Sequence, residues 1–147
     1  MKTLLEPKEV LHLKELGVEF EDTACQWIFV PNFADDWMLE SSRSAEYYHA
    51  LPQEEQGGIL PAPCLSEVLK KLPVCINVHN KYPSLQPYEC DTFFFLIFDG
   101  VEYVIGYRQL GEGYEIAFSG SNFIEIAYQS LKYLAKNNYL KKDVGNV

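Results

Sequence analysis

The sequence predicts a single α+β domain, with helices packed on one face of an antiparallel sheet of about four to five strands. Three observations lead to this prediction: an amphipathic helical run near the start, a long apolar stretch with two tight turns after residue 91, and a second amphipathic run at the end. We see no internal repeat and no second domain in the 147 residues, and residues 141–147 are expected to be a frayed tail.

The first third of the chain predicts two helices and a strand pair. Val10, Leu11, Leu13 and Leu16 follow a mostly helical spacing, and Gly17 is a natural helix stop. The expected elements are a helix over 7–16, a strand over 24–31 (ACQWIFVP), its hairpin partner over 37–41 (WMLES) and a short helix over 44–51 (SAEYYHAL).

The middle of the chain predicts a helix over 64–72 followed by a strand over 74–79. Two prolines precede the helix in LPAPCLSEVLKKLP, and Cys64 with Glu67 has the spacing of a capping box. In the strand VCINVH, the valines and the isoleucine are expected to face the core, with the cysteine, asparagine and histidine on the other side.

The stretch DTFFFLIFDGVEYVIGYRQ (91–109) predicts a hairpin with Asp99-Gly100 as a type I′ turn. That turn would place Phe98 opposite Val101, Leu96 opposite Tyr103 and Gly106 opposite Phe93. One resulting face is almost entirely apolar and is expected to face the helices.

A second turn at LGEG (110–113) extends the sheet by one strand, with Ile105 opposite Phe118 and Arg108 opposite Glu115. The final stretch NFIEIAYQSLKYLAKNNYL predicts the closing helix, with Asn122 as its N-cap and Glu125 three residues later.

The sheet face directed away from the helices is the feature of the sequence that most indicates a function. It has an apolar centre and a charged rim of Asp91, Glu102, Arg108 and Glu115, as protein-binding surfaces often do. The irregular segment 33–60 is an alternative occupant that would simply cover this face. The candidate partner-binding residues on it are Phe93, Phe95, Ile97, Val104 and Arg108.

The net charge of −9 is distributed unevenly. Residues 1–67 carry the whole excess, and residues 68–147 have equal numbers of acidic and basic side chains. Asp35 and Asp36 lie in the most acidic stretch, between Glu19 and Glu55. Such a surface repels phosphate, so we expect no direct nucleic-acid binding. It would attract a basic partner or imitate DNA, or it would serve only as a solvated face.

The cysteines are interpreted as free thiols of a cytoplasmic protein rather than a disulfide framework, since no C-x-x-C pair is present. Cys64 could be a nucleophile activated by a helix end, but we interpret it as the residue that begins the helix, because no partner base is recognisable. The remaining catalytic candidates are Cys75, His49 and His79.

No metal or cofactor site is expected. The cysteines and histidines lack the close spacing of zinc ligands, and LGEG lacks the lysine and helix of a phosphate loop. No apolar run reaches the ~20 residues of a membrane helix, and the charged start MKTLLEPKEV is not typical of a secretory signal.

LPAPCLSEVLKKL together with SNFIEIAYQSLKYLAKNNYL resembles a group of small, uncharacterised proteins encoded by phages and prophages of gut bacteria. Members carry a helix introduced by a Pro-Ala-Pro-Thr-like motif and end in a helix with Asn-x-Tyr-hydrophobic, which Asn137 to Leu140 match. This chain has Cys64 where threonine is common. The resemblance covers about a third of the chain and implies a mobile-element context without a catalytic activity.

The leading hypothesis is therefore a small intracellular, non-enzymatic protein that binds another protein or a second copy of itself. Two alternatives remain open. The first is a cysteine-dependent hydrolase or transferase, and the second is a small-ligand module with a pocket between the sheet and residues 41–60.

Overall fold

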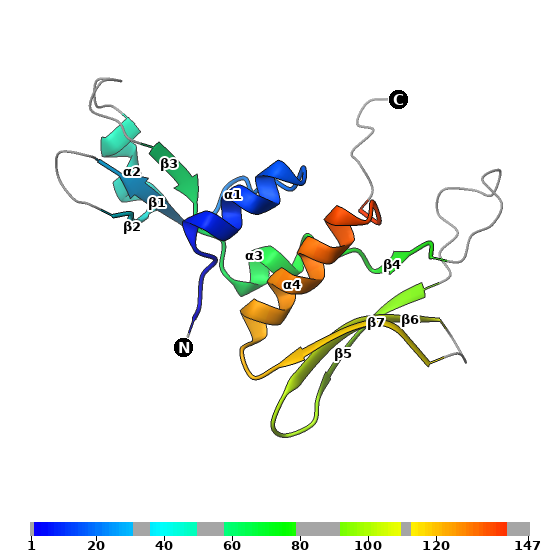
Figure 1. Ribbon diagram of the computed structural model, residues 1–147. Coiled ribbons are helices and arrows are strands. Elements are labelled where there is room, and N and C mark those ends of the chain that lie inside the picture. Colours follow the sequence, from blue (N-terminus) through cyan, green and yellow to red (C-terminus); the bar gives the residue numbers. More distant parts are fainter. Residues whose placement is uncertain (1, 31–35, 50–57, 79–91, 110–112, 141–147) are drawn as a thin grey trace. The chain divides into compact units, whose positions relative to one another are not determined.

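The computed structural model describes residues 2–30, 36–49, 58–78, 92–109 and 113–140, without the side chains of 48, 49 and 113–115. Helices and antiparallel strands are both present, so the predicted α+β class is confirmed (Figure 1). The strands form two sheets, one of three and one of four strands. The chain divides into an N-terminal unit, Lys2–Glu67, and a C-terminal unit, Val68–Val147. That these form one domain stays a prediction.

The first helix, α1 (Pro7–Glu15), begins with a capping box. The backbone N–H of Glu6 donates to Oε1 of Glu9 at 2.9 Å, and Glu9 also pairs with Lys2. Gly17 follows the helix with φ +89°, a conformation that glycine adopts at little cost. The predicted helix and its stop are confirmed.

The three-stranded sheet has the order β2-β1-β3 and is antiparallel throughout. Strands β1 (Cys25–Phe29) and β2 (Met38–Ser41) are the predicted hairpin pair, followed by α2 (Ser42–His49), the predicted short helix. Strand β3 (Gly58–Pro61) was not predicted, because it has only four residues, of which the first is a glycine and the last a proline.

The second half begins with elements shorter than predicted. Helix α3 (Leu65–Leu69) ends in turn structure before residue 72, and β4 (Cys75–Ile76) has two residues rather than six. Ile76 is buried as expected, but Val74 is 79% exposed, so its predicted core position is wrong. Val74 lies before β4, so the alternation of side chains along the strand does not direct it into the core.

The four-stranded antiparallel sheet has the order β4-β5-β6-β7. Its three long strands are β5 (Thr92–Phe98), β6 (Tyr103–Gln109) and β7 (Gly113–Gly120). Phe98 pairs with Tyr103 and Phe95 with Gly106, two residues away from the predicted register.

The turn explains this difference. Oδ1 of Asp99 accepts hydrogen bonds from the N–H groups of Val101 and Glu102, at 2.9 and 2.8 Å, and the Asp99 N–H donates to the Glu102 carbonyl. Gly100 has φ +96°, whereas Asp99 lacks the positive φ that a type I′ turn requires. The connection is therefore four residues long. Because side chains alternate with a period of two, the shift leaves every residue on its predicted face.

The register between β6 and β7 is the predicted one at Ile105–Phe118 and Tyr107–Ile116. An irregularity between Tyr107 and Arg108 then places Arg108 opposite Tyr114, so the predicted pairing with Glu115 is wrong. A bulge adds one residue to one strand, which shifts all later pairs.

Helix α4 (Phe123–Lys136) covers one face of this sheet, along β6 and β7 (Figure 1). Oδ1 of Asn122 accepts from the Glu125 N–H at 3.3 Å, which confirms the predicted cap. The rings of Phe123 and Tyr103 stack with centroids 4.7 Å apart, so Tyr103 identifies the sheet face next to the helix. We call this face the inner face; its other members include Phe94, Leu96, Phe98, Ile105, Tyr107, Ile116 and Phe118.

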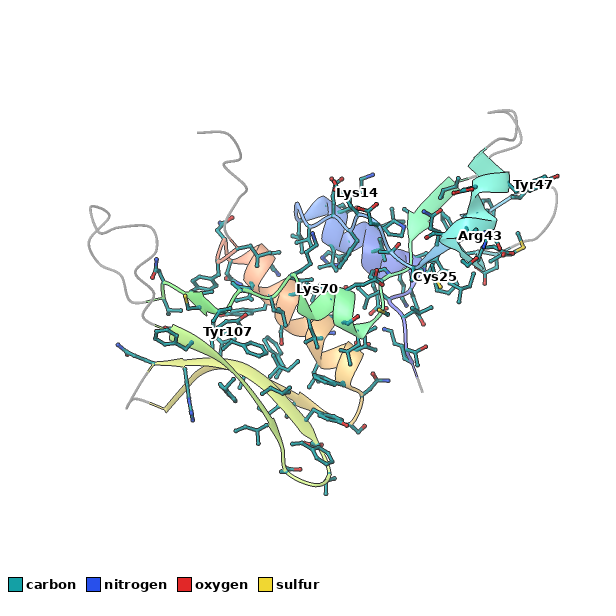
Figure 2. All side chains as sticks on the ribbon, turned by 180° about the vertical axis from the view of Figure 1, so that it is seen from behind. Lys14, Cys25, Arg43, Tyr47, Lys70 and Tyr107 are labelled. Atoms are coloured by element: carbon teal, nitrogen blue, oxygen red, sulfur yellow. The ribbon has the colours of Figure 1, made fainter. Side chains whose placement is uncertain are left out.

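Tyr107 lies in the core of the C-terminal unit (Figure 2). Its side chain is 1% exposed, and its hydroxyl donates to the Pro73 carbonyl at 2.7 Å. Burial raises the pKa of the phenol well above its usual value of 10. The Phe94 ring meets it edge-on at 5.7 Å, so one tyrosine links β5, β6 and the segment before β4.

Candidate protein-binding surface

The face of the four-stranded sheet opposite α4, which we call the outer face, carries exposed apolar side chains. Phe93 on β5 is 38% exposed, and Ile97 on the same strand is 38% exposed. Val104 on β6 lies directly opposite Ile97 and is half-buried. Period-two alternation places these three on one side, away from the ring contacts between the inner face and α4.

Phe95 occupies the centre of the outer face but is only 9% exposed. It lies directly across from Gly106, and a Cβ at Gly106 would come within 2.7 Å of the Phe95 ring. The glycine therefore lets the ring lie flat over β6. The sequence predicts Phe95 as a partner-binding residue, and the structure leaves only a small part of its side chain open to a partner.

Arg108, two residues after Gly106 and on the same face of β6, covers the same ring. Its guanidinium carbon is 5.5 Å from the Phe95 ring centroid, within the range of a cation–π contact. The contact places the guanidinium over the centre of the outer face, and the Arg108 side chain remains exposed. Glu102 at the hairpin end is also exposed. The other predicted rim charges, Asp91 and the Glu115 side chain, lie outside the described residues.

The acidic pair predicted at the loop after β1 is described only in part. Asp35 lies outside the described residues. Asp36 is exposed, and its Oδ1 accepts a hydrogen bond from the Trp37 N–H at 2.7 Å. This is a local turn contact. Across the described ranges, no three histidine, cysteine or acidic side chains are grouped to hold a metal ion.

Cys64 begins α3, as interpreted from the sequence. Its N–H donates to Oε1 of Glu67 at 2.9 Å, and Oε2 of the same carboxylate accepts from the Ala24 N–H at 3.3 Å. The Cys64 Sγ is 3.3 Å from the Ser66 hydroxyl. Glu67 thus joins the start of α3 to the start of β1, and Cys64 belongs to this junction.

Among the other catalytic candidates, Cys75 is the one whose side chain belongs to the described residues. Cys25 and Cys64 are free, but Cys75 is disulfide-bonded, so the expectation of a free thiol is wrong at this position. The cysteines have no C-x-x-C spacing that would have indicated this bond. The side chain of His49 and the whole of His79 lie outside the described residues.

The N-terminal unit also contains a cavity that was not predicted from the sequence, lined by Val10, Phe20 and Leu60 among others. The expected pocket involved residues 41–60, and only β3 contributes from that stretch. The cavity is formed by α1, the segment directly after it and β3, which is distant from both in sequence, so no local motif could have indicated it.

No protein-family model, curated protein or solved structure matches the chain. Among the helices of the described residues, none has both the length and the apolar character needed to cross a membrane.

Proposed function

We propose that the chain acts by binding another protein through the outer face of its four-stranded sheet. The observation that carries this proposal is the exposure of Phe93 and Ile97 on the side opposite α4. Apolar area in contact with water is unfavourable at about 25 cal/mol per Å². Covering these side chains with a partner would therefore lower the free energy of the complex.

The packing of Phe95, at the centre of the same face, also favours binding. Phe95 is held between the Gly106 backbone and the Arg108 guanidinium, so the centre of the surface is fixed before a partner arrives. Preformed surfaces lose less conformational entropy on association. Arginine and aromatic residues are also enriched in protein interfaces, where they act as anchors.

The cysteine-dependent enzyme has less support. A nucleophilic cysteine needs a free thiolate and a base within reach. Cys75 is disulfide-bonded, and the Cys64 N–H is committed to Glu67 at the start of α3. Cys64 has no hydrogen bond with a histidine among the described residues.

A phage or prophage origin belongs to the proposal on sequence grounds alone. Its support is the Pro-Ala-Pro start before α3 and the ending after α4. Pro63 and Ala62 of the first motif are buried, so the motif has a packing role in the N-terminal unit. This role does not depend on any partner.

The test removes the exposed apolar side chains without creating a buried charge. We expect the double variant Phe93→Gln, Ile97→Gln to lose the proteins that co-purify with the wild-type chain from cells that naturally express it. Leu96→Gln is the matched control, because Leu96 is 45% exposed on the same strand but on the inner face. A double variant that retains the same partners, with an unchanged melting temperature, would refute the proposal.

A further inference from the structure

The N-terminal unit contains a cavity of about 200 Å³ between α1, the segment that follows it, and β3. Its floor is apolar: Val10, Phe20 and Leu60 are each less than 10% exposed. An apolar cavity of ~150 Å³ suffices for a benzene molecule. The cavity is therefore large enough for one leucine-sized side chain.

The rim of the cavity is charged. Lys14 lies in the last turn of α1 (Figure 2), and Glu19 and Glu21 lie on the segment that leads to β1. All three are exposed, and within the part of the chain that the structure describes their side chains form no ion pair or hydrogen bond. Two carboxylates and one ammonium give the entrance a negative balance.

The unit that holds the cavity also holds the entire net charge. The boundary between the two units falls after Glu67, and the segment up to that residue carries −9 while the remainder is neutral. A compact acidic unit produces a field that concentrates cationic segments near its surface. A cationic segment attracted in this way can pair with the carboxylates of Glu19 and Glu21 at the rim of the cavity.

We propose that this cavity receives an apolar side chain from a basic peptide segment of another protein, with the flanking lysines or arginines of that segment against Glu19 and Glu21. Apolar burial gives the site its anchor, and charge complementarity gives it selectivity for cationic segments. The site and the outer face have no residue in common, and this proposal does not rest on the function proposed for that face.

The probes are three blocked pentapeptides, KKLKK, KKGKK and EELEE, each titrated into the full chain with methyl resonances observed by NMR. We expect KKLKK to shift the methyl signals of Val10 and Leu60 and to bind at least tenfold more tightly than KKGKK, because only the leucine fills the cavity. We expect no binding of EELEE, and weaker binding of KKLKK as salt rises. Equal affinity for KKLKK and KKGKK, or shifts confined to other residues, would overturn the proposal.

Charge reversal at the rim tests the position of the site. Glu19→Lys with Glu21→Lys should weaken KKLKK binding at least tenfold. Glu40→Lys with Glu46→Lys makes the same charge change elsewhere in the unit, on β2 and α2, and should have a much smaller effect. Equal losses in the two variants would mean that the peptide responds only to overall charge, which contradicts a site at the cavity.

Discussion

Two polar side chains of the C-terminal unit hold backbone groups that its strands leave unpaired. Tyr107 donates to the Pro73 carbonyl from within the core, and Asp99 accepts two backbone N–H groups at the hairpin end. An unpaired backbone group in the core is costly, so the Tyr107 hydroxyl stabilises the segment before β4, whereas the Asp99 contacts lie at the exposed hairpin end. Their partners could not be predicted from composition, since each depends on the final register.

We expect Tyr107→Phe to lower the free energy of unfolding by about 1 kcal/mol, because the Pro73 carbonyl loses its donor. Chemical denaturation measures this change. Tyr103→Phe is the control: Tyr103 is on the same strand and face, but no hydrogen bond of its hydroxyl occurs among the described residues, and its loss should be near zero. Equal effects for the two variants would show that the Tyr107 hydrogen bond is not responsible.

The hairpin turn should respond to acid. The N–H groups of Glu102 and Val101 lower the pKa of Asp99 below its usual value of 3.8. A lowered folded-state pKa stabilises the fold above the unfolded-state value, and this stabilisation is lost as the pH falls through the folded-state pKa. We expect the amide proton shifts of Val101 and Glu102 to stay constant at neutral pH and to move together below pH ~4. A change in these amide proton shifts at a higher pH would contradict the hydrogen bonds from Val101 and Glu102 to Asp99.

At the scale of the elements, Phe95 over Gly106 joins β5 to β6 on the outer face. On β5 and β6 the alternation of apolar residues predicted both faces correctly, although the register was wrong by two residues, because an even shift leaves every side chain on its face. The sequence did not predict that Phe95 would be buried, since that depends on which residue lies opposite the glycine. It also missed β3, whose four residues lack a clear period.

Gly106→Ala should therefore destabilise the sheet. The added Cβ would lie 2.4 Å from the Ile116 carbonyl oxygen and 2.7 Å from the Phe95 ring, and overpacking of this kind costs about 1–3 kcal/mol. Thermal melting would measure the loss. Ala117→Ser, at the exposed position opposite Gly106 on β7, is the matched control and should melt like the wild type. An unchanged melting temperature for Gly106→Ala would contradict the packing of Phe95 on the glycine.

At the scale of the whole molecule, the charge boundary read from the sequence coincides with the boundary between the two compact units. The division of strands into two sheets was not predicted, because hydrophobic alternation identifies strands but not the sheet to which each belongs. The outer face was predicted from alternation alone. The cavity was not, since it depends on the tertiary arrangement of three segments.

The cysteines provide a prediction at this scale. Under denaturing conditions without reductant, we expect iodoacetamide to label Cys25 and Cys64 fully and Cys75 only after reduction. Peptide mapping by mass spectrometry distinguishes the three sites. Labelling of Cys75 before reduction would contradict the disulfide and would restore the residue as a candidate nucleophile.

Site-specific photo-crosslinking shows directly whether the outer face binds a protein. A photoreactive phenylalanine analogue replaces Phe93 on the outer face or, in a parallel sample, Leu96 on the inner face, and the chain is irradiated in cells that naturally express it. We predict a discrete crosslinked protein from position 93 that is absent from position 96. No adduct at position 93, or the same adducts from both positions, would contradict the claim.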